Sequence, residues 1–254
     1  MQSMISIAST MQDQCKPAIT APLSLIKPLR IKYLLLALLL LLLGWHVRAF
    51  TQVLELRSSN PEMSAFMEQA LESRQEKNPQ AKLQHHPVAY KRIATNLKRA
   101  VIAAEDASFV DHNGFDLDGI QLAMEKNLKA GHITAGGSTI SQQLAKNLFL
   151  SGERTLLRKA EESVYTLMLE ATLSKQRILE LYLNYAEWGN GIYGAEAAAR
   201  HYYGIPASMI SPWQAARLAA ILPNPRYYDG RRTDWITQKS KSIRRYMPMV
   251  RIPR

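Results

Sequence analysis

Cysteine is almost absent from this chain, which has one, Cys15, among 254 residues. A single cysteine cannot form an internal disulfide, and its place near the N-terminus argues against a catalytic thiol. The sequence also lacks zinc-finger spacing, the aromatic signatures of RNA-binding modules and a glycine-rich dinucleotide fingerprint. Although the net charge is +11, lysines and arginines are spread along the chain. We therefore expect no nucleic-acid partner and no required cofactor.

Alternating β-branched runs and internal repeats are missing as well. With 47% hydrophobic residues, a chain of this length can build one substantial core. Apolar residues recur instead at helical spacing, most clearly in three stretches, "GGSTISQQLAKNLFL", "RTLLRKAEESVYTLMLEATL" and "SKQRILELYLNYA". The sequence therefore predicts a mainly α fold with one main domain.

One long hydrophobic run is present, residues 33–47, "YLLLALLLLLLGWHV", flanked by Lys32 and Arg48. Extended to residues 31–50, it is long enough to span a bilayer, and the flanking cations can reach the interfaces. Most nearby basic residues precede it, so the positive-inside rule predicts a cytoplasmic N-terminus. The alternative is a cleaved signal peptide, but Val47-Arg48-Ala49 is a poor cleavage site. We expect an uncleaved single-pass anchor.

The composition changes three times along the chain. Residues 1–30 lack periodicity, and the two prolines of "NPQAKLQHHPVAY" end a charged helical stretch that follows the apolar run. The expected regions are a cytoplasmic tail (1–30), a transmembrane anchor (31–50), a stalk (51–92) and a catalytic domain (93–254).

Two helices carry most of the polar residues that invite a functional interpretation. Ser138 or Thr139 is expected to cap the first, with Gln142 or Gln143 completing a capping box. The exposed N–H groups at this helix start favour an anion site. The second helix is expected to direct its apolar residues inward, namely Leu157, Ala160, Val164, Leu167, Met168 and Ala171.

An acidic pair, Glu105 and Asp106, directly follows the apolar run 100–104. An isolated acidic pair usually marks a solvated helix end. Packed behind Val101 and Ala104, however, Glu105 is expected to be partly desolvated, which raises a carboxyl pKa toward the working pH of a general base.

Four motifs appear in order along the chain. They are Glu105-Asp106-x-x-Phe109-x-x-His112-x-Gly114, Gly137-Ser138-Thr139-Ile140-Ser141-Gln142-Gln143, Arg158-Lys159-x-x-Glu162 and Lys175-x-x-Ile178-Leu179-Glu180-x-Tyr182-Leu183-Asn184. Over about Lys98 to Asn224 the chain resembles the peptidoglycan glycosyltransferases, glycosyltransferase family 51, and above all its monofunctional biosynthetic transglycosylases. Ser141 stands where the family usually has threonine. The fifth family motif, an Arg-Arg pair before an apolar pair, is matched only loosely by Lys239 and Ser240 before Ile243.

The resemblance implies a lysozyme-like helical glycosyltransferase domain on the periplasmic side of a bacterial inner membrane. It further implies polymerisation of lipid II into β-1,4-linked glycan with release of undecaprenyl pyrophosphate. Growing lipid-linked glycan and proteins of cell division or wall synthesis are the implied partners. A divalent cation, Mg²⁺ or Mn²⁺, can serve as a phosphate partner, although no dedicated metal ligands are visible. No transpeptidase motifs follow the catalytic region, which favours the monofunctional class.

The resemblance also assigns roles to individual residues. Glu105 is expected to be the general base of an inverting displacement, and Glu162 a second essential acid. The cations expected at the pyrophosphate are Lys146, Arg154, Arg158 and Lys159. The polar residues expected to contact substrate are Ser138, Thr139, Gln142, Gln143 and Asp106. Structural alternatives remain: Asp106 and His112 can brace a turn, one glutamine can serve only the helix cap, and the cations can lie on a solvated face.

Two further expectations remain open at the level of sequence. Residues 115–137 form a glycine-punctuated connector that we expect to be mobile and to touch the bilayer, with a core helix as the alternative. For function, the alternatives to a polymerase are a lysozyme-like muramidase or lytic transglycosylase, and an inactive membrane-anchored scaffold.

Overall fold

The computed structural model describes residues 28–132, 136–153 and 155–253. The expected cytoplasmic tail and Arg154 lie outside these residues. The chain divides into two units, Met1–Val47 and Arg48–Arg254. Helix α1 (Pro28–Glu55) begins in the first unit, and its segment Ile31–Glu55 is the one helix in the described chain that is long and apolar enough to cross a membrane. It is consistent with the predicted single-pass anchor.

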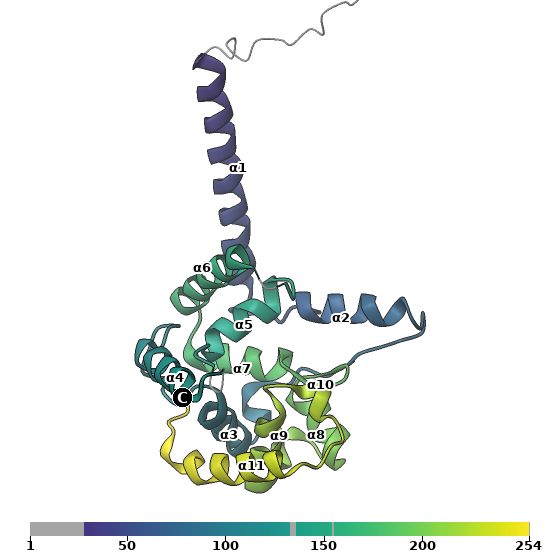
Figure 1. Ribbon diagram of the computed structural model, residues 1–254. Helices are drawn as coiled ribbons and strands as arrows, with labels where there is room; N and C mark the ends of the chain where they lie inside the picture. The colour runs from purple at the N-terminus through teal and green to yellow at the C-terminus, as the bar shows by residue number, and fades with distance from the viewer. Residues whose placement is uncertain (1–27, 133–135, 154, 254) are drawn as a thin grey trace, which may run out of the picture. The chain divides into compact units, whose positions relative to one another are not determined.

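The second unit is mainly α-helical (Figure 1), as predicted. After the end of α1, its helices are α2 (Ala65–Gln75), α3 (Thr95–Glu105), α4 (Leu117–Ala130), α5 (Ile140–Phe149), α6 (Leu156–Thr172), α7 (Lys175–Tyr185), α8 (Ala195–Tyr203), α9 (Pro212–Ile221), α10 (Pro225–Tyr228) and α11 (Asp234–Tyr246). Short 3-10 helices η2 (Tyr90–Arg92), η3 (Ala207–Met209) and η4 (Met247–Met249) join them. Strands β1 (Gln84–His85), β2 (Glu187–Gly189) and β3 (Ile192–Tyr193) form one small sheet in the order β1-β3-β2, with β1 parallel and β2 antiparallel to β3.

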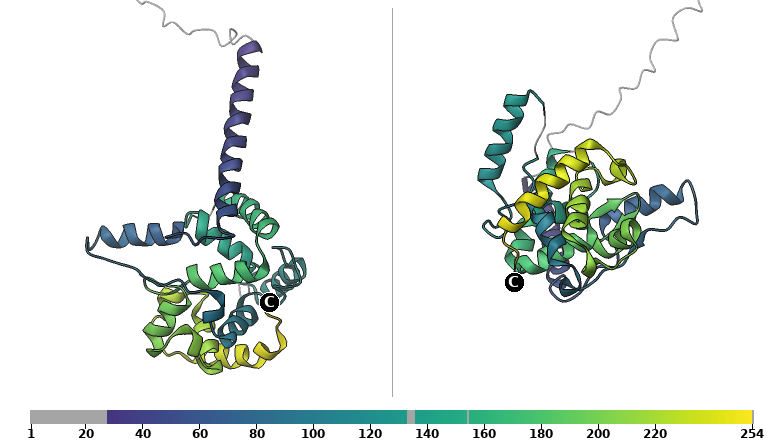
Figure 2. Two further views of the ribbon diagram at one scale, coloured as in Figure 1. Left: turned by 180° about the vertical axis from the view of Figure 1, so that it is seen from behind. Right: turned by 90° about the horizontal axis from the view of Figure 1, so that it is seen from below.

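Helix α7 lies at the centre of this unit, as Figures 1 and 2 show. Its side chains Ile178, Leu179, Leu181 and Leu183 are fully buried, so apolar residues surround the helix and not only one face of it. Helices α5 and α6 pack on one side of α7, while α3, α9 and α11 form a second packed group. The functional motifs are carried by the helices where these two groups meet.

Residues 48–92 belong to the same unit as the remainder of the chain. Val53, Leu56 and Met67 are buried in the common core. The buried Asn184 amide of α7 accepts a hydrogen bond from the Val88 N–H and donates one to the Val88 carbonyl, both at 2.9 Å. Charged residues surround these anchors in the sequence, which is why composition alone suggested a linker.

Helix α6 has the opposite orientation to the one predicted. Its buried residues are Glu162, Tyr165, Thr166 and Leu169. The predicted inward face is largely exposed: Leu157 and Leu167 are 72% and 56% accessible, and Ala160 and Ala171 are also exposed. The apolar spacing was correct for a helix, but the polar side of α6 faces the interior of the protein. We call residues 157, 160, 164, 167 and 171 the outer stripe of α6.

Residues 117–130 of the glycine-punctuated connector form the regular helix α4. Asp116 caps its start by accepting a hydrogen bond from Gly119 N–H at 2.8 Å, and Gly131 ends it with φ +71°. Figures 1 and 2 show α4 at the edge of the unit. Among its residues only Ala123 is buried, so the alternative of a core helix is wrong. The exposed apolar side chains of α4 are Leu117, Leu122, Met124 and Leu128.

Candidate active site

Glu105 is the last residue of α3, and its carboxylate points toward α5. Its Oε2 accepts a hydrogen bond of 2.9 Å from Gln143 Nε2, and Gln143 Oε1 in turn accepts one of 3.0 Å from the Tyr182 hydroxyl of α7. Burial raises the pKa of Glu105, while the Gln143 hydrogen bond and the charges of Lys239 and Lys146 lower it. Burial is the larger effect, so Glu105 is held as a better proton acceptor than an exposed carboxylate.

Asp106 begins the turn after α3 and has both carboxylate oxygens engaged within the protein. Oδ1 lies 2.9 Å from His112 Nε2, and Oδ2 accepts a hydrogen bond of 3.0 Å from Ile140 N–H at the start of α5. Gly114 N–H donates to His112 Nδ1, which places the ring proton on Nε2, facing Asp106. Asp106 therefore connects the first motif to the second and orients the residue beside it.

The start of α5 satisfies its own N–H groups. Thr139 is the N-cap, and it forms a complete capping box with Gln142. The Thr139 hydroxyl also donates to the Gly114 carbonyl at 2.7 Å. With Asp106 on the Ile140 N–H, this helix start is closed by protein groups, which differs from the open anion site that the glycines before it suggested. Of the two glutamines, Gln142 completes the cap and Gln143 contacts Glu105.

Glu105 lies beside two pockets. One, of about 210 Å³, is lined by Glu105 and Asp106 together with Gly119 of α4 and Ser138 and Thr139. The other, of about 190 Å³, is lined by its partner Gln143 and by other residues that include Lys146, Tyr182 and Glu187. A carboxylate with one pocket at its side and another at its hydrogen-bond partner is placed to act between two bound groups.

Lys146 lies two turns along α5 from its N-cap and carries the positive charge of the second pocket. Its ammonium lies 5.4 Å from the centre of the Phe66 ring. Burial lowers the pKa of Lys146, the carboxylates of Glu162 and Glu105 raise it, and the cations Arg158 and Lys159 lower it. The charges of both acids, Glu105 and Glu162, thus act on Lys146. An anion bound beside Lys146 would favour its charged form further.

Glu162 is buried on the inner face of α6 and holds two cations of its own helix. Arg158 Nη1 donates to Glu162 Oε2 at 2.8 Å, and Lys159 Nζ pairs with Glu162 Oε1. Arg158 and Lys159 thus pair with Glu162 within one helix, with the Arg158 side chain largely buried and that of Lys159 45% exposed. Two cations around one acid leave a net positive charge next to Lys146.

The predicted site residues thus fall into three groups. Glu105, Asp106, Ser138 and Thr139 line one pocket, and Gln143 and Lys146 line the other. The third group is Glu162 with Arg158 and Lys159, whereas Arg154 is outside the described residues. In the described part of the chain no three acidic, histidine or cysteine side chains gather at one point, and both oxygens of Glu162 already hold cations. This donor set does not fit a resident divalent ion, so we assign no catalytic step to one.

Two residues take part that sequence reasoning did not place in the site. Tyr182 appeared only as a member of the fourth motif, yet its hydroxyl donates to the amide that holds Glu105. Lys239 was named only as a loose match to a family motif, yet its charge acts on Glu105. The signal for Lys239 was available: it lies on α11 between the buried residues Ile236 and Ile243 and next to buried Ser240, so a cation occupies the inner face of an amphipathic helix.

A mainly helical unit with a half-buried carboxylate at one pocket, a second pocket at its hydrogen-bond partner and a nearby group of cations suits a transglycosylase. A family model described as Transglycosylase matches residues 72–248, so the chain belongs to this family.

Within this family, the chain is similar to biosynthetic peptidoglycan transglycosylases. The biosynthetic peptidoglycan transglycosylase of Azoarcus sp. (strain BH72) is 55% identical over 219 residues, which are 86% of this chain and 95% of that protein. The protein of the same name from Methylobacillus flagellatus is 56% identical over 230 residues, 90% of this chain and 100% of that protein. The family resemblance drawn from the four motifs is confirmed.

Proposed function

We propose that this protein is a peptidoglycan glycosyltransferase that polymerises lipid II into β-1,4-linked glycan and releases undecaprenyl pyrophosphate. The observation that carries the proposal is the half-buried Glu105 carboxylate, which has a raised pKa and lines one pocket, while its hydrogen-bond partner Gln143 lines a second pocket that contains Lys146. One pocket suits a sugar acceptor, and the cations beside the other suit a phosphorylated donor.

The reaction we propose is a single inverting displacement. Glu105 takes the proton of the acceptor 4-hydroxyl while that oxygen attacks the anomeric carbon of the donor, whose bond to pyrophosphate breaks. Lys146, Arg158 and Lys159 balance the negative charge that develops on the departing pyrophosphate, and Glu162 keeps the last two in position. Gln143 and Tyr182 orient the base. A donor that brings its own lipid pyrophosphate needs no nucleotide.

The lipid part of this substrate would stay in the membrane. The outer stripe of α6 and the exposed apolar residues of α4 are amphipathic surfaces of the kind that lie at a bilayer interface. Leu156, at the start of α6, is 91% accessible and extends this apolar surface. We infer a single-pass protein of the bacterial inner membrane, with a cytoplasmic N-terminus and the catalytic unit on the periplasmic side.

The test is polymerisation of lipid II by the purified full-length protein in detergent or liposomes. Glu105→Gln should lower the rate about 10²- to 10⁴-fold, the contribution typical of a general base. Glu72→Gln, which changes an exposed acid of α2, is the matched control and should retain full activity. Cleavage of finished glycan without polymer formation would support the muramidase alternative. If the protein showed neither activity, the inactive scaffold would be the remaining alternative.

A further inference from the structure

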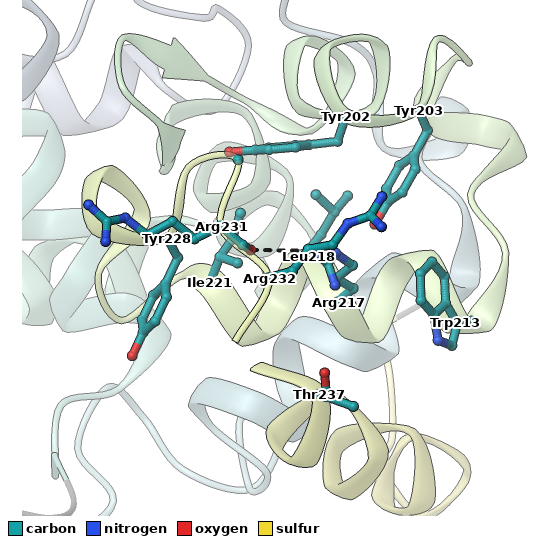
Figure 3. Close-up of a pocket in the computed structure, with 11 residues that line it drawn as sticks. Tyr202, Tyr203, Trp213, Arg217, Leu218, Ile221, Tyr228, Arg231, Arg232 and Thr237 are labelled. Atoms are coloured by element: carbon teal, nitrogen blue, oxygen red, sulfur yellow. Dashed lines mark hydrogen bonds between the residues drawn. The ribbon is translucent and has the colours of Figure 1, made fainter. Parts of the chain in front are cut away.

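A cavity of about 530 Å³ lies among α8, α9, α10 and α11, away from Glu105 (Figure 3). Its walls are aromatic: Tyr202 and Tyr203 come from α8, Trp213 from α9 and Tyr228 from α10. Trp213 is 52% accessible, so the cavity is open at this rim. Its size falls within the range of ligand pockets, roughly 300 to 1,000 Å³.

Three arginines, Arg217, Arg231 and Arg232, also line the cavity. Within the described residues none of them lies within ion-pair distance of a carboxylate. Arg217 is half-buried, lies 5.9 Å from the centre of the Trp213 ring and donates a hydrogen bond of 3.3 Å to the Arg231 carbonyl. A half-buried guanidinium with no acidic partner favours an anionic ligand.

Asp229, which lies between Tyr228 and Gly230 of the cavity wall, is already engaged. Its Oδ1 accepts a hydrogen bond of 2.9 Å from the Tyr202 hydroxyl, and its Oδ2 accepts one of 2.9 Å from Asn190 N–H. Asp229 therefore cannot turn toward the arginines without breaking both bonds. The positive charge of the cavity is left for a ligand to balance.

The same short segment separates this cavity from the Glu105 cleft. Ile221 lines the cavity, and its neighbours Leu222, Pro223 and Pro225 line the pocket that contains Lys146. Arg226 Nε donates to both carboxylate oxygens of Glu187, at 2.8 and 3.0 Å, which fixes the segment to the small sheet. The two sites lie on opposite sides of one braced wall.

We propose that this cavity binds the peptide branch of the glycan on which the protein acts, through the carboxylate of that branch. The inference rests on the proposed function, because it takes the substrate to be a disaccharide carrying a peptide. A peptide ends in a carboxylate, which pairs with a guanidinium by two parallel hydrogen bonds. The aromatic walls offer apolar surface to the side chains and sugar rings next to it. The pockets at Glu105 and Gln143 would then bind the reacting sugars, and the arginine-lined cavity would bind the peptide branch.

The test measures binding without turnover. Full-length protein in detergent is titrated with a soluble disaccharide-peptide released from finished glycan, and Trp213 fluorescence or heat is followed. Arg217→Gln should weaken binding about 10-fold or more, equivalent to about 1.4 kcal/mol. Arg217→Lys keeps the charge but loses the two parallel N–H donors of the guanidinium. Its affinity should lie between those of the unaltered protein and Arg217→Gln. Arg244→Gln, at an exposed position of α11, is the matched control.

Three results would overturn the inference: no binding by the unaltered protein, equal binding of the disaccharide without peptide, or unchanged binding by a folded Arg217→Gln variant. Equal binding of an unrelated peptide would also overturn it, since the cavity would then recognise any chain end. Glu105→Gln should bind as the unaltered protein does. If the protein forms polymer but does not bind the disaccharide-peptide, only the inference about the cavity is refuted. If it binds the disaccharide-peptide but forms no polymer, only the proposed polymerase activity is refuted.

Discussion

At the scale of single residues, the central feature is a carboxylate whose protonation is set by opposing neighbours. Burial raises the pKa of Glu105, and Gln143, Lys239 and Lys146 limit the rise. A base of this kind is active above its pKa, since only the ionised form accepts a proton. Activity should therefore appear as the pH rises through a value above the ordinary range of a glutamate.

Replacing the partner of Glu105 tests this balance. Gln143→Leu removes the hydrogen bond that favours the ionised carboxylate, so the pKa of Glu105 should rise further and the acid limb of the rate profile should move to higher pH. The measurement is the polymerisation rate between pH 5 and pH 9. Tyr182→Phe, which keeps the amide but removes the hydroxyl behind it, should move the limb less. A limb that stays in place in Gln143→Leu would contradict Glu105 as the titrating base.

At the scale of helices, the sequence predicted where helices form better than it predicted which of their faces are buried. The helix start at Thr139 and the helical spacing of residues 156–172 were both readable in the sequence. The direction of α6 was not, because a periodic apolar stripe marks a face without saying what covers it. Glu162 with its two cations takes the inner face together with Leu169, and Leu157 and Leu167 are turned outward.

Removing the cap of α5 should destabilise the protein. Thr139→Ala loses the oxygen that accepts the Gln142 N–H and the hydroxyl that donates to the Gly114 carbonyl. The expected loss is about 1 to 2 kcal/mol in the free energy of unfolding. Urea denaturation measures it, and Thr139→Ser, which retains the hydroxyl, serves as the control. Equal losses in both variants would mean that the methyl group, and not the cap, is responsible.

The outer stripe of α6 gives a prediction about membranes. Leu157→Gln combined with Leu167→Gln places amides on exposed positions, so the melting temperature should change little. If the stripe contacts lipid, the double variant should polymerise lipid II more slowly in liposomes than the unaltered protein, with a smaller difference in detergent. A matched double substitution at exposed polar positions of α2, Glu72→Gln with Ser73→Asn, should have no effect. Equal rates in liposomes would rule out contact between this stripe and the bilayer.

At the scale of the whole molecule, the class, the mainly helical fold and the four ordered motifs were predictable from sequence. Three things were not. The packing of residues 51–92 onto α7 depends on contacts between distant positions, such as Val88 and Asn184, that no local pattern displays. Lys239 reaches Glu105 only because α11 returns to α3. The arginine-lined cavity combines short, unremarkable segments from four helices.

Asn184 tests how far this long-range connection supports the fold. Asn184→Leu keeps a similar volume and leaves the buried N–H and carbonyl of Val88 without partners. The expected cost is about 2 to 4 kcal/mol, one to two for each unpaired group. Chemical denaturation gives the value, and Asn190→Leu, at an exposed position after β2, is the comparison. A cost below about 1 kcal/mol would show that residues 84–88 are held mainly by other contacts.

The two faces of α6 also constrain the distance between the ionic group of the substrate and its hydrocarbon chain. Arg158 and Lys159, the cations that we propose bind the phosphate, pair with Glu162 on one side of this helix, and Leu157 and Leu167 are exposed on the other. The two groups are separated by the width of a helix with its side chains, about 10 to 12 Å. A donor must therefore present its ionic group at a fixed height above the hydrocarbon that carries it. Synthetic donors with a polar spacer inserted between the prenyl chain and the pyrophosphate should lose reactivity once the spacer exceeds that span, even with the sugars unchanged.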